Sequence, residues 1–218
     1  MQNTVGNHQT FDGLSKRVKQ LYERYGVVPK DIGSGRHFFD LDKLYYHGIN
    51  GAAEYISLLA EYLAALKSHH AIKDFDTLMV TKEVELSPLL AGTFLAIIEE
   101  HNKINPQVPI KHGLVYVDWL ESPTTLLQFR GLNLETKYDG ILILYPGEHS
   151  FSRVVPRAMS DLKRIGLSYL DEKPNLRGVV QVIDHEDGFD TFIQEIARKK
   201  LGYQVNYHKI LSISDFGK

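Results

Sequence analysis

The fold of this chain is decided by residues 138–166, which read YDGILILYPGEHSFSRVVPRAMSDLKRIG. Residues 141–144 are four successive apolar residues, the pattern of a strand buried on both faces. The Pro-Gly pair at 146–147 ends that strand, because proline donates no backbone hydrogen bond and Pro-Gly favours a turn. Apolar residues then recur at helical spacing over 154–165, and Gly166 suits the end of a helix. The stretch predicts a buried strand, a tight turn and a helix.

The turn between this strand and this helix is the first candidate site. A helix that follows a buried parallel strand presents free backbone N–H groups, which bind anions such as phosphate. An ordinary surface connection is the alternative, because the turn has only one glycine and matches neither a Walker sequence nor a dinucleotide fingerprint. The candidate phosphate-binding residues of the turn are Glu148, His149, Ser150, Ser152 and Arg153.

The composition is that of an ordinary globular protein. The chain has 218 residues, of which 43% are apolar and 24% charged, and its net charge of −2 gives no general attraction to nucleic acid or to an anionic membrane. The absence of cysteine excludes disulfides, thiolate zinc sites and cysteine nucleophiles. No apolar run reaches membrane-spanning length, and residues 1–10 are too polar for a signal peptide. We therefore expect a cytoplasmic protein.

Strands and helices alternate along the chain. Strands are predicted at 37–41, 75–81, 114–119, 141–144, 178–183 and 205–213, and helices at 11–25 (with Thr10 as N-cap), 50–67, 88–98, 154–166 and 189–197. This order predicts an α/β protein with a mostly parallel sheet flanked by helices on both faces. Residues 26–35 are predicted as a loop, and residues 121–137 as either a long loop or a β-excursion. We expect a single domain, with an N-terminal helical and hood lobe (1–70) and an α/β core (71–218).

Binding sites in such sheets lie at the carboxyl ends of the strands. One of these ends, 184–187, reads Asp-His-Glu-Asp and contains several possible metal ligands. Consecutive side chains in a turn do not converge on one ion, so a solvated acidic turn is the better interpretation and no metal site is predicted. Lys111-His112-Gly113 precedes a strand and is interpreted as a turn.

The order of elements resembles a type I phosphoribosyltransferase of the orotate phosphoribosyltransferase branch over nearly the whole chain. The matching segments are the opening helix (14–27), the pyrimidine-recognising hood (34–36 and 38–44), the pyrophosphate-loop strand with its following helix (74–76 and 87–91), the late strand with its acidic turn (178–188) and the closing segment (211–216). The resemblance implies a base-or-anion pocket at Ser34, Arg36 and Asp40, and a pyrophosphate-loop position at Thr81 and Lys82. It also implies a homodimer.

The family's active-site motifs are altered in this chain. The two adjacent acids that hold the ribose hydroxyls of phosphoribosyl pyrophosphate are replaced by Tyr145 and Pro146. The Thr/Gly phosphate cradle is replaced by residues 149–153, and residues 82–86 contain two carboxylates and no glycine where a short glycine turn is expected. We therefore predict a degenerate protein without transferase activity, which acts as a nucleotide- or phosphate-binding, regulatory or partner-subunit module.

Two alternatives remain open. The first is an active, divergent transferase that moves ribose 5-phosphate from phosphoribosyl pyrophosphate to a pyrimidine-type base, with Glu148 on the ribose; only this alternative requires Mg²⁺, and no other cofactor is predicted. The second is an interaction role, in which the tyrosine-rich N-terminal lobe (Tyr45, Tyr46, Tyr55, Tyr62) forms a dimer.

Overall fold

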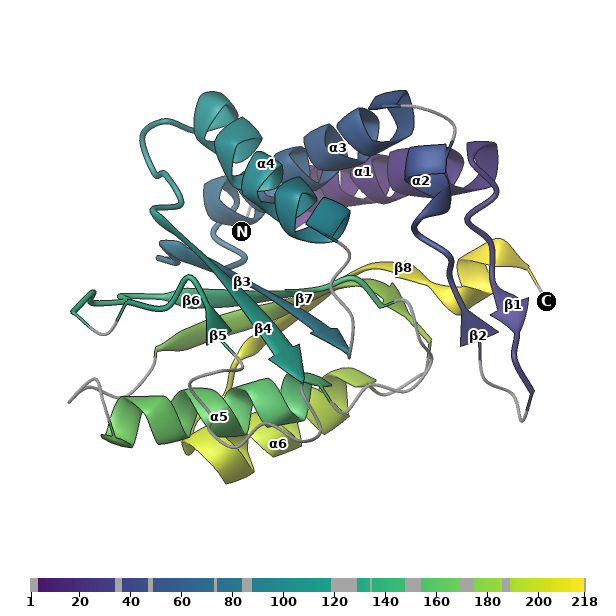
Figure 1. Ribbon diagram of the computed structural model, residues 1–218. Helices are drawn as coiled ribbons and strands as arrows, with labels where there is room; N and C mark the ends of the chain where they lie inside the picture. The colour runs from purple at the N-terminus through teal and green to yellow at the C-terminus, as the bar shows by residue number, and fades with distance from the viewer. Residues whose placement is uncertain are drawn as a thin grey trace.

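At the centre of the molecule lies a six-stranded sheet in the order β5-β4-β3-β6-β7-β8 (Figure 1). The computed structural model describes residues 4–33, 37–46, 49–72, 74–83, 88–118, 129–133, 135–147, 154–168, 175–185 and 189–217. The strands are β3 (Thr77–Glu83), β4 (His112–Asp118), β5 (Phe129–Arg130), β6 (Ile141–Tyr145), β7 (Leu176–Asp184) and β8 (Asn206–Ser212). Only β5 is antiparallel to its neighbour within this sheet. The predicted mostly parallel sheet is confirmed.

Helices cover both faces of the sheet (Figure 1). One layer contains α1 (Thr4–Arg24), α2 (Lys43–Tyr46), α3 (Ile49–Ser68) and α4 (Pro88–Ile104), and the other contains α5 (Val154–Ser168) and α6 (Phe189–Leu201). A short 3₁₀ helix, η2 (Ile213–Phe216), follows β8. Within the described part of the chain, no helix has both the length and the apolar character needed to cross a membrane.

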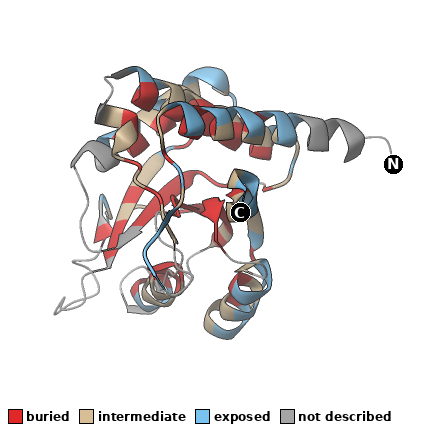
Figure 2. Ribbon diagram, turned by 90° about the vertical axis from the view of Figure 1, so that its right-hand side faces the viewer, coloured by how far each residue is buried: buried red, intermediate tan, exposed pale blue. Residues whose placement is uncertain are grey.

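The central strand β6 contributes to both hydrophobic cores. It pairs in parallel with β3 on one side and β7 on the other, and all five of its residues are buried. Leu142 and Leu144 belong to the core under α1, α3 and α4, whereas Ile143 and Tyr145 belong to the core under α5 and α6. Figure 2 shows the sheet as mainly buried between helices whose outer faces are exposed. Cover on both faces is the reason this strand is a continuous apolar run in the sequence.

Two of the four tyrosines predicted to form a dimer surface lie inside the molecule. Tyr55 and Tyr62 are almost completely buried in the core between the N-terminal helices and the sheet, so their side chains are not available to a second subunit. The Tyr45 hydroxyl forms a hydrogen bond with the Thr93 hydroxyl. The side chain of Tyr46 lies outside the described residues. The interpretation of this tyrosine set as a dimer surface is therefore wrong for Tyr55 and Tyr62, because their rings complete the core between helices.

Several predicted boundaries are corrected by the structure. α1 begins at Thr4, so Thr10 lies within the helix and is not its N-cap. The predicted loop at 26–35 contains a short strand, β1 (Lys30–Asp31), which forms an antiparallel hairpin with β2 (His37–Phe38). α5 continues past Gly166 to Ser168. Of the segment 121–137, the described residues include β5, so a β-excursion is correct for that part.

The predicted turn at residues 111–113 is also wrong, because His112 and Gly113 are the first two residues of β4. The backbone N–H groups of Lys111 and His112 both donate to the Asp76 carbonyl, over 2.7 and 3.1 Å, and this aligns the segment with the start of β3. A Cβ at Gly113 would lie 2.9 Å from Ile98 of α4. The glycine that suggested a turn therefore permits close packing of a helix on the strand.

Candidate functional site

The carboxyl edge of the sheet is formed by the ends of the parallel strands, among which β6 lies between β3 and β7 (Figure 1). The Tyr116 hydroxyl of β4 donates a 2.7 Å hydrogen bond to Asp161 of α5, which holds this helix against the sheet. The predicted phosphate-binding residues 148–153 lie between β6 and α5 and outside the described residues. Their role as a phosphate site stays a prediction.

Tyr145 ends β6 as a core residue. Its side chain is 4% exposed and packs in the cluster under α5 and α6, which also contains Met79 and Val154. Alternation along β6 explains this direction, because residues 141, 143 and 145 point to the same face of the sheet. Tyr145 therefore fills the space between strand and helix instead of reaching into solvent at the edge.

Gly147 connects the turn after β6 to the end of β7. Its φ of 76° lies in the left-handed region, and a Cβ at this position would lie 2.3 Å from the Ile183 carbonyl oxygen. The Gly147 carbonyl accepts a hydrogen bond from His185 Nε2 over 2.5 Å, which requires that this ring nitrogen carry the proton. The two neighbouring strand ends are therefore joined directly, with no space for a side chain between them.

Asp184 and His185 are buried at the end of β7, which corrects the prediction of a solvated acidic turn for these two residues. Asp184 is 4% exposed and forms an ion pair with Lys209 of β8, whose Nζ lies 3.5 Å from its Oδ2. Burial, and secondarily the Asp184 carboxylate, raise the pKa of the neighbouring Tyr207 hydroxyl above its ordinary value. Neighbouring strands thus supply partners that the acidic sequence did not reveal. Glu186 and Asp187 lie outside the described residues.

The β1–β2 hairpin contacts this edge through Phe39. The Phe39 ring is fully buried and meets the His185 imidazole edge-on, with 5.3 Å between ring centroids, and it also packs against Phe216 of η2. Of the predicted base-or-anion pocket, Ser34 and Arg36 lie outside the described residues. Asp40 is described, and its carboxylate lies 3.4 Å from Lys30 Nζ. The hairpin is therefore held beside the ends of β7 and β8.

Solved structures of the same architecture identify the fold. Mycobacterium tuberculosis H37Rv orotate phosphoribosyltransferase in complex with Fe(III) dicitrate matches with a TM-score of 0.53 and 18% identity, over 96% of this chain and 99% of that chain. The orotate phosphoribosyltransferase from Aeropyrum pernix matches with a TM-score of 0.52 and 10% identity, over 91% and 95%. Leishmania donovani UMP synthase matches with a TM-score of 0.51 and 15% identity, over 94% of this chain and 37% of that chain. The chain has the type I phosphoribosyltransferase fold.

The fold expected from the order of elements is thus confirmed, while identities of this size establish the fold and leave activity open. No protein-family model matches the sequence, and no curated protein has significant sequence similarity to it. Among the described residues, no group of three or more His, Cys, Asp or Glu side chains is arranged to hold a metal ion.

In this phosphoribosyltransferase fold, the predicted pyrophosphate-loop position lies within a strand. Thr81 and Lys82 belong to β3, which continues to Glu83 in register with Asp118 of β4, so the predicted end of the strand at Thr81 is corrected. Thr81 is fully buried, and its hydroxyl has no hydrogen-bond partner among the described residues. The Lys82 side chain is not among those described. Binding of pyrophosphate at these two residues remains a prediction.

Two contacts at this edge were missed in the sequence. His185 appeared only as a possible metal ligand, and its bond to Gly147 depends on β6 and β7 being neighbours in the sheet. Phe39 appeared only as part of the hood segment, and its contact with His185 spans most of the chain. Parallel topology alone could have suggested the first contact, because it brings the carboxyl ends of adjacent strands together.

Proposed function

We propose that this chain is a phosphoribosyltransferase-fold protein that has no transferase activity and binds a phosphate-bearing ligand, such as a nucleotide, in a regulatory or partner-subunit role. The observation that carries the proposal is the burial of Tyr145, which stands where the resembled family has the first of its two adjacent acids. An acid at this position would accept hydrogen bonds from ribose hydroxyls. A tyrosine ring packed under α5 does not offer a carboxylate to a sugar.

Asp184, an acid at the end of the neighbouring strand β7, already has a partner within the protein. It is buried and paired with Lys209, so its carboxylate serves to join β7 to β8. Turning this carboxylate toward a ribose and Mg²⁺ would break its ion pair with Lys209, whose side chain is partly exposed. This pairing supports a protein that has lost the sugar-diphosphate chemistry.

Phosphate binding is supported by the sequence of the turn and by the position of α5. A helix of 15 residues begins at Val154, directly after a segment with two serines and Arg153. Backbone N–H groups at such a helix start attract anions, and a guanidinium binds phosphate through two parallel hydrogen bonds. A phosphate group would require neither the lost acids nor Mg²⁺.

Isothermal titration calorimetry with inorganic phosphate, UMP and phosphoribosyl pyrophosphate, each with and without Mg²⁺, tests the proposal together with an orotate turnover assay. We expect binding that does not depend on Mg²⁺, and no consumption of orotate. Arg153→Met should weaken binding at least tenfold, whereas Lys163→Met, an exposed cation further along α5, should leave it unchanged. Mg²⁺-dependent binding of phosphoribosyl pyrophosphate with turnover would instead establish the divergent transferase.

We further propose a cytoplasmic homodimer, as the resemblance and the cysteine-free sequence suggest. Size-exclusion chromatography with light scattering should give twice the chain mass of 24.8 kDa. Because Tyr55 and Tyr62 are buried, substitutions of exposed residues are the appropriate probes of the contact. A mass of one chain across the micromolar range would exclude the dimer.

A further inference from the structure

A cavity of about 350 Å³ opens at the amino edge of the sheet, opposite the edge where the phosphoribosyltransferase-type site is expected. It is formed by the end of α3, the segment leading into β3, the α4–β4 loop and the residue preceding Gly140. Its ionisable lining residues are Lys67, His70, Asp74, Asp76, Lys111 and Asp139. This volume lies near the lower end of ligand-binding cavities, which run from about 300 to 1,000 Å³, so it suits a molecule much smaller than a nucleotide.

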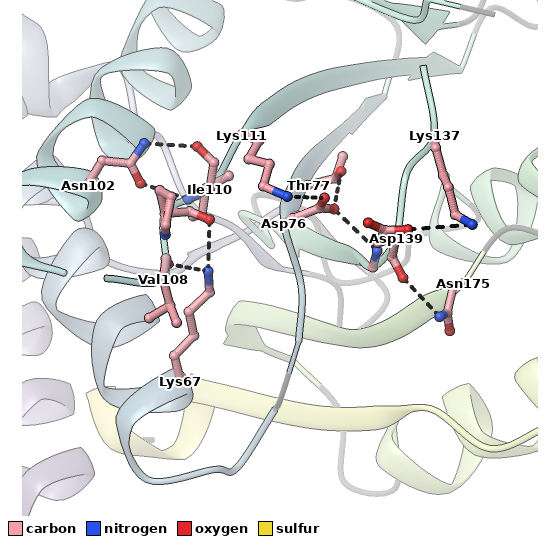
Figure 3. Close-up of polar contacts among 12 residues, drawn as sticks. Lys67, Asp76, Thr77, Asn102, Val108, Ile110, Lys111, Lys137, Asp139 and Asn175 are labelled. Atoms are coloured by element: carbon pink, nitrogen blue, oxygen red, sulfur yellow. Dashed lines mark hydrogen bonds and ion pairs between the residues drawn. The ribbon is translucent and has the colours of Figure 1, made fainter. Parts of the chain in front are cut away.

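Lys67 places a buried ammonium group in the wall of this cavity. The residue is only 9% exposed, and its Nζ donates to the carbonyls of Val108 and Pro109 over 2.7 and 3.4 Å (Figure 3). The same Nζ lies 4.3 Å above the Phe75 ring. The two carbonyls accept two of the three N–H donors of the ammonium, and among the described residues the Phe75 ring is the only further acceptor beside it. Burial, opposed by Asp76 and Asp74, lowers the pKa of Lys67 to about 8.

Asp76 places a largely buried carboxylate in the wall of the same cavity. Its Oδ1 accepts hydrogen bonds from the Thr77 hydroxyl over 2.9 Å and from the Gly140 N–H over 3.2 Å. Its Oδ2 lies 3.7 Å from Nζ of the exposed Lys111, too far for a hydrogen bond (Figure 3). This oxygen has only a distant cation as its partner and can accept a hydrogen bond from a ligand donor.

The backbone around the cavity adopts an uncommon conformation at two positions. His70 and Asp74 have φ angles of 55° and 57°, in the left-handed region that residues other than glycine seldom occupy. Both residues line the cavity, and Asp74 follows the turn that closes α3. Strained residues of this kind collect at binding sites, where the surrounding structure holds a side chain in a required direction.

From these contacts we propose that the amino-edge cavity is a second binding site, which takes a free amino acid or a closely similar small zwitterion. Two ammonium groups and three carboxylates line it, so a simple anion meets repulsion from the carboxylates and a simple cation meets repulsion from the lysines. A zwitterion can pair with both the lysine ammonium groups and the aspartate carboxylates. Its carboxylate would accept from Lys67 and Lys111, and its ammonium would donate to Asp76 Oδ2 and Asp74.

The test uses the full chain and each of the twenty free amino acids separately, first by thermal shift and then by isothermal titration calorimetry. We expect saturable binding of at least one amino acid, with one site per chain. Its N-acetyl derivative, which keeps only the carboxylate, and its carboxamide, which keeps only the ammonium, should each bind at least tenfold more weakly. The absence of saturable binding for all twenty, or equal binding of a blocked derivative, would overturn the proposal.

Variants then locate the site. Asp74→Asn removes one charge and suits the left-handed backbone, because asparagine tolerates this region well, and Lys111→Met removes a charge from an exposed side chain. Each should weaken binding at least fivefold while the unfolding transition stays within a few degrees of wild type. Lys103→Met, an exposed lysine of α4 outside the cavity, should bind as wild type does. Unchanged binding in both Asp74→Asn and Lys111→Met would refute the assignment.

Discussion

Replacing Tyr145 by aspartate restores the residue type that the resembled family carries at the end of this strand, and it tests whether that position can face a ligand. The structure predicts that it cannot, because the tyrosine side chain lies in the core under α5 with 4% of its surface exposed. The aspartate would have to sit in the same apolar surroundings. The expected result is loss of stability without gain of ligand binding.

The size of the loss follows from the burial. A buried tyrosine removes roughly 150–250 Å² from water, which at about 25 cal/mol per Å² corresponds to about 4–6 kcal/mol of stabilisation. Aspartate recovers little of this, and its carboxyl group must also be desolvated or protonated. A domain of this kind is stable by only about 5–15 kcal/mol, so Tyr145→Asp should be close to unfolding at pH 7.

The assay is urea unfolding followed by circular dichroism between pH 4 and pH 8. Burial should raise the pKa of the introduced carboxyl group in the folded state. The folded variant then binds more protons than the unfolded chain, so its stability relative to wild type should fall as the pH rises above about 4. Tyr145→Phe, which keeps the ring, should lose no more than about 1–3 kcal/mol.

The reasoning would be refuted if Tyr145→Asp lost less than about 0.5 kcal/mol at pH 7, a change within the range of ordinary surface substitutions. That outcome would mean that the side chain at position 145 reaches solvent at the carboxyl edge. Calorimetry of the same variant with phosphoribosyl pyrophosphate and Mg²⁺ provides the second readout. Restored Mg²⁺-dependent binding would show that a single residue separates this chain from a sugar-diphosphate site.

Three further predictions concern other parts of the structure. Gly147→Ala should destabilise by about 2–5 kcal/mol, measured by urea unfolding, because strain at positive φ is added to a clash with the Ile183 carbonyl. Asn102→Ala should cost about 2–4 kcal/mol in the same assay, because Asn102 bonds both the N–H and the carbonyl of Ile110 over 2.7 and 2.8 Å. For Lys67, whose pKa is lowered to about 8, the unfolded chain binds more protons between pH 8 and 10.5; the stability of wild type relative to Lys67→Met should therefore rise across that window.

Control variants separate backbone strain from steric clash at Gly147 and test the other two predictions. Gly202 also has a positive φ, 85°, but no atom lies within 4 Å of an added Cβ, so Gly202→Ala should lose only the conformational part, about 1–2 kcal/mol. An equal loss in Gly147→Ala would contradict the clash at the carboxyl edge. Lys103→Ala controls for Asn102→Ala on the same helix and should change stability by less than about 0.5 kcal/mol. A flat difference between wild type and Lys67→Met from pH 8 to 10.5 would contradict the burial of that ammonium.

The sequence predicts the fold well where burial is uniform. Residues 141–144 are apolar without interruption because β6 is covered on both faces. This pattern can be recognised in the sequence without knowing which strands lie beside β6. The sequence is less informative about where helices begin and end. α1 begins six residues before Thr10, in a polar segment with no apolar period. The two-residue strand β5 is too short to leave any pattern.

The site is harder to predict than the fold because charge alone does not report partners. Residues 184–187 are dense in acids, which suggested a solvated turn, yet Asp184 is buried against Lys209, a residue supplied by the next strand. Likewise Lys67 and Asp76 have no distinguishing sequence motif, and only the meeting of α3 with the start of β3 brings them to one cavity. Pairing between segments distant in sequence decides whether a charged residue is solvent-exposed, structural or available to a ligand.

The two edges of the sheet therefore differ in a way that bears on function. At the carboxyl edge several described groups engage one another: His185 donates to Gly147, Asp184 pairs with Lys209, and Tyr145 fills the core, while the buried Thr81 hydroxyl has no partner among the described residues. At the amino edge, buried Lys67 and Asp76 keep hydrogen-bonding capacity directed at a cavity. Unsatisfied capacity in a buried charged group is costly unless something binds it, whereas a satisfied network is stable without a ligand. In the described residues, Asp184 at the carboxyl edge is thus paired within the protein, whereas Lys67 and Asp76 at the amino edge line an open cavity.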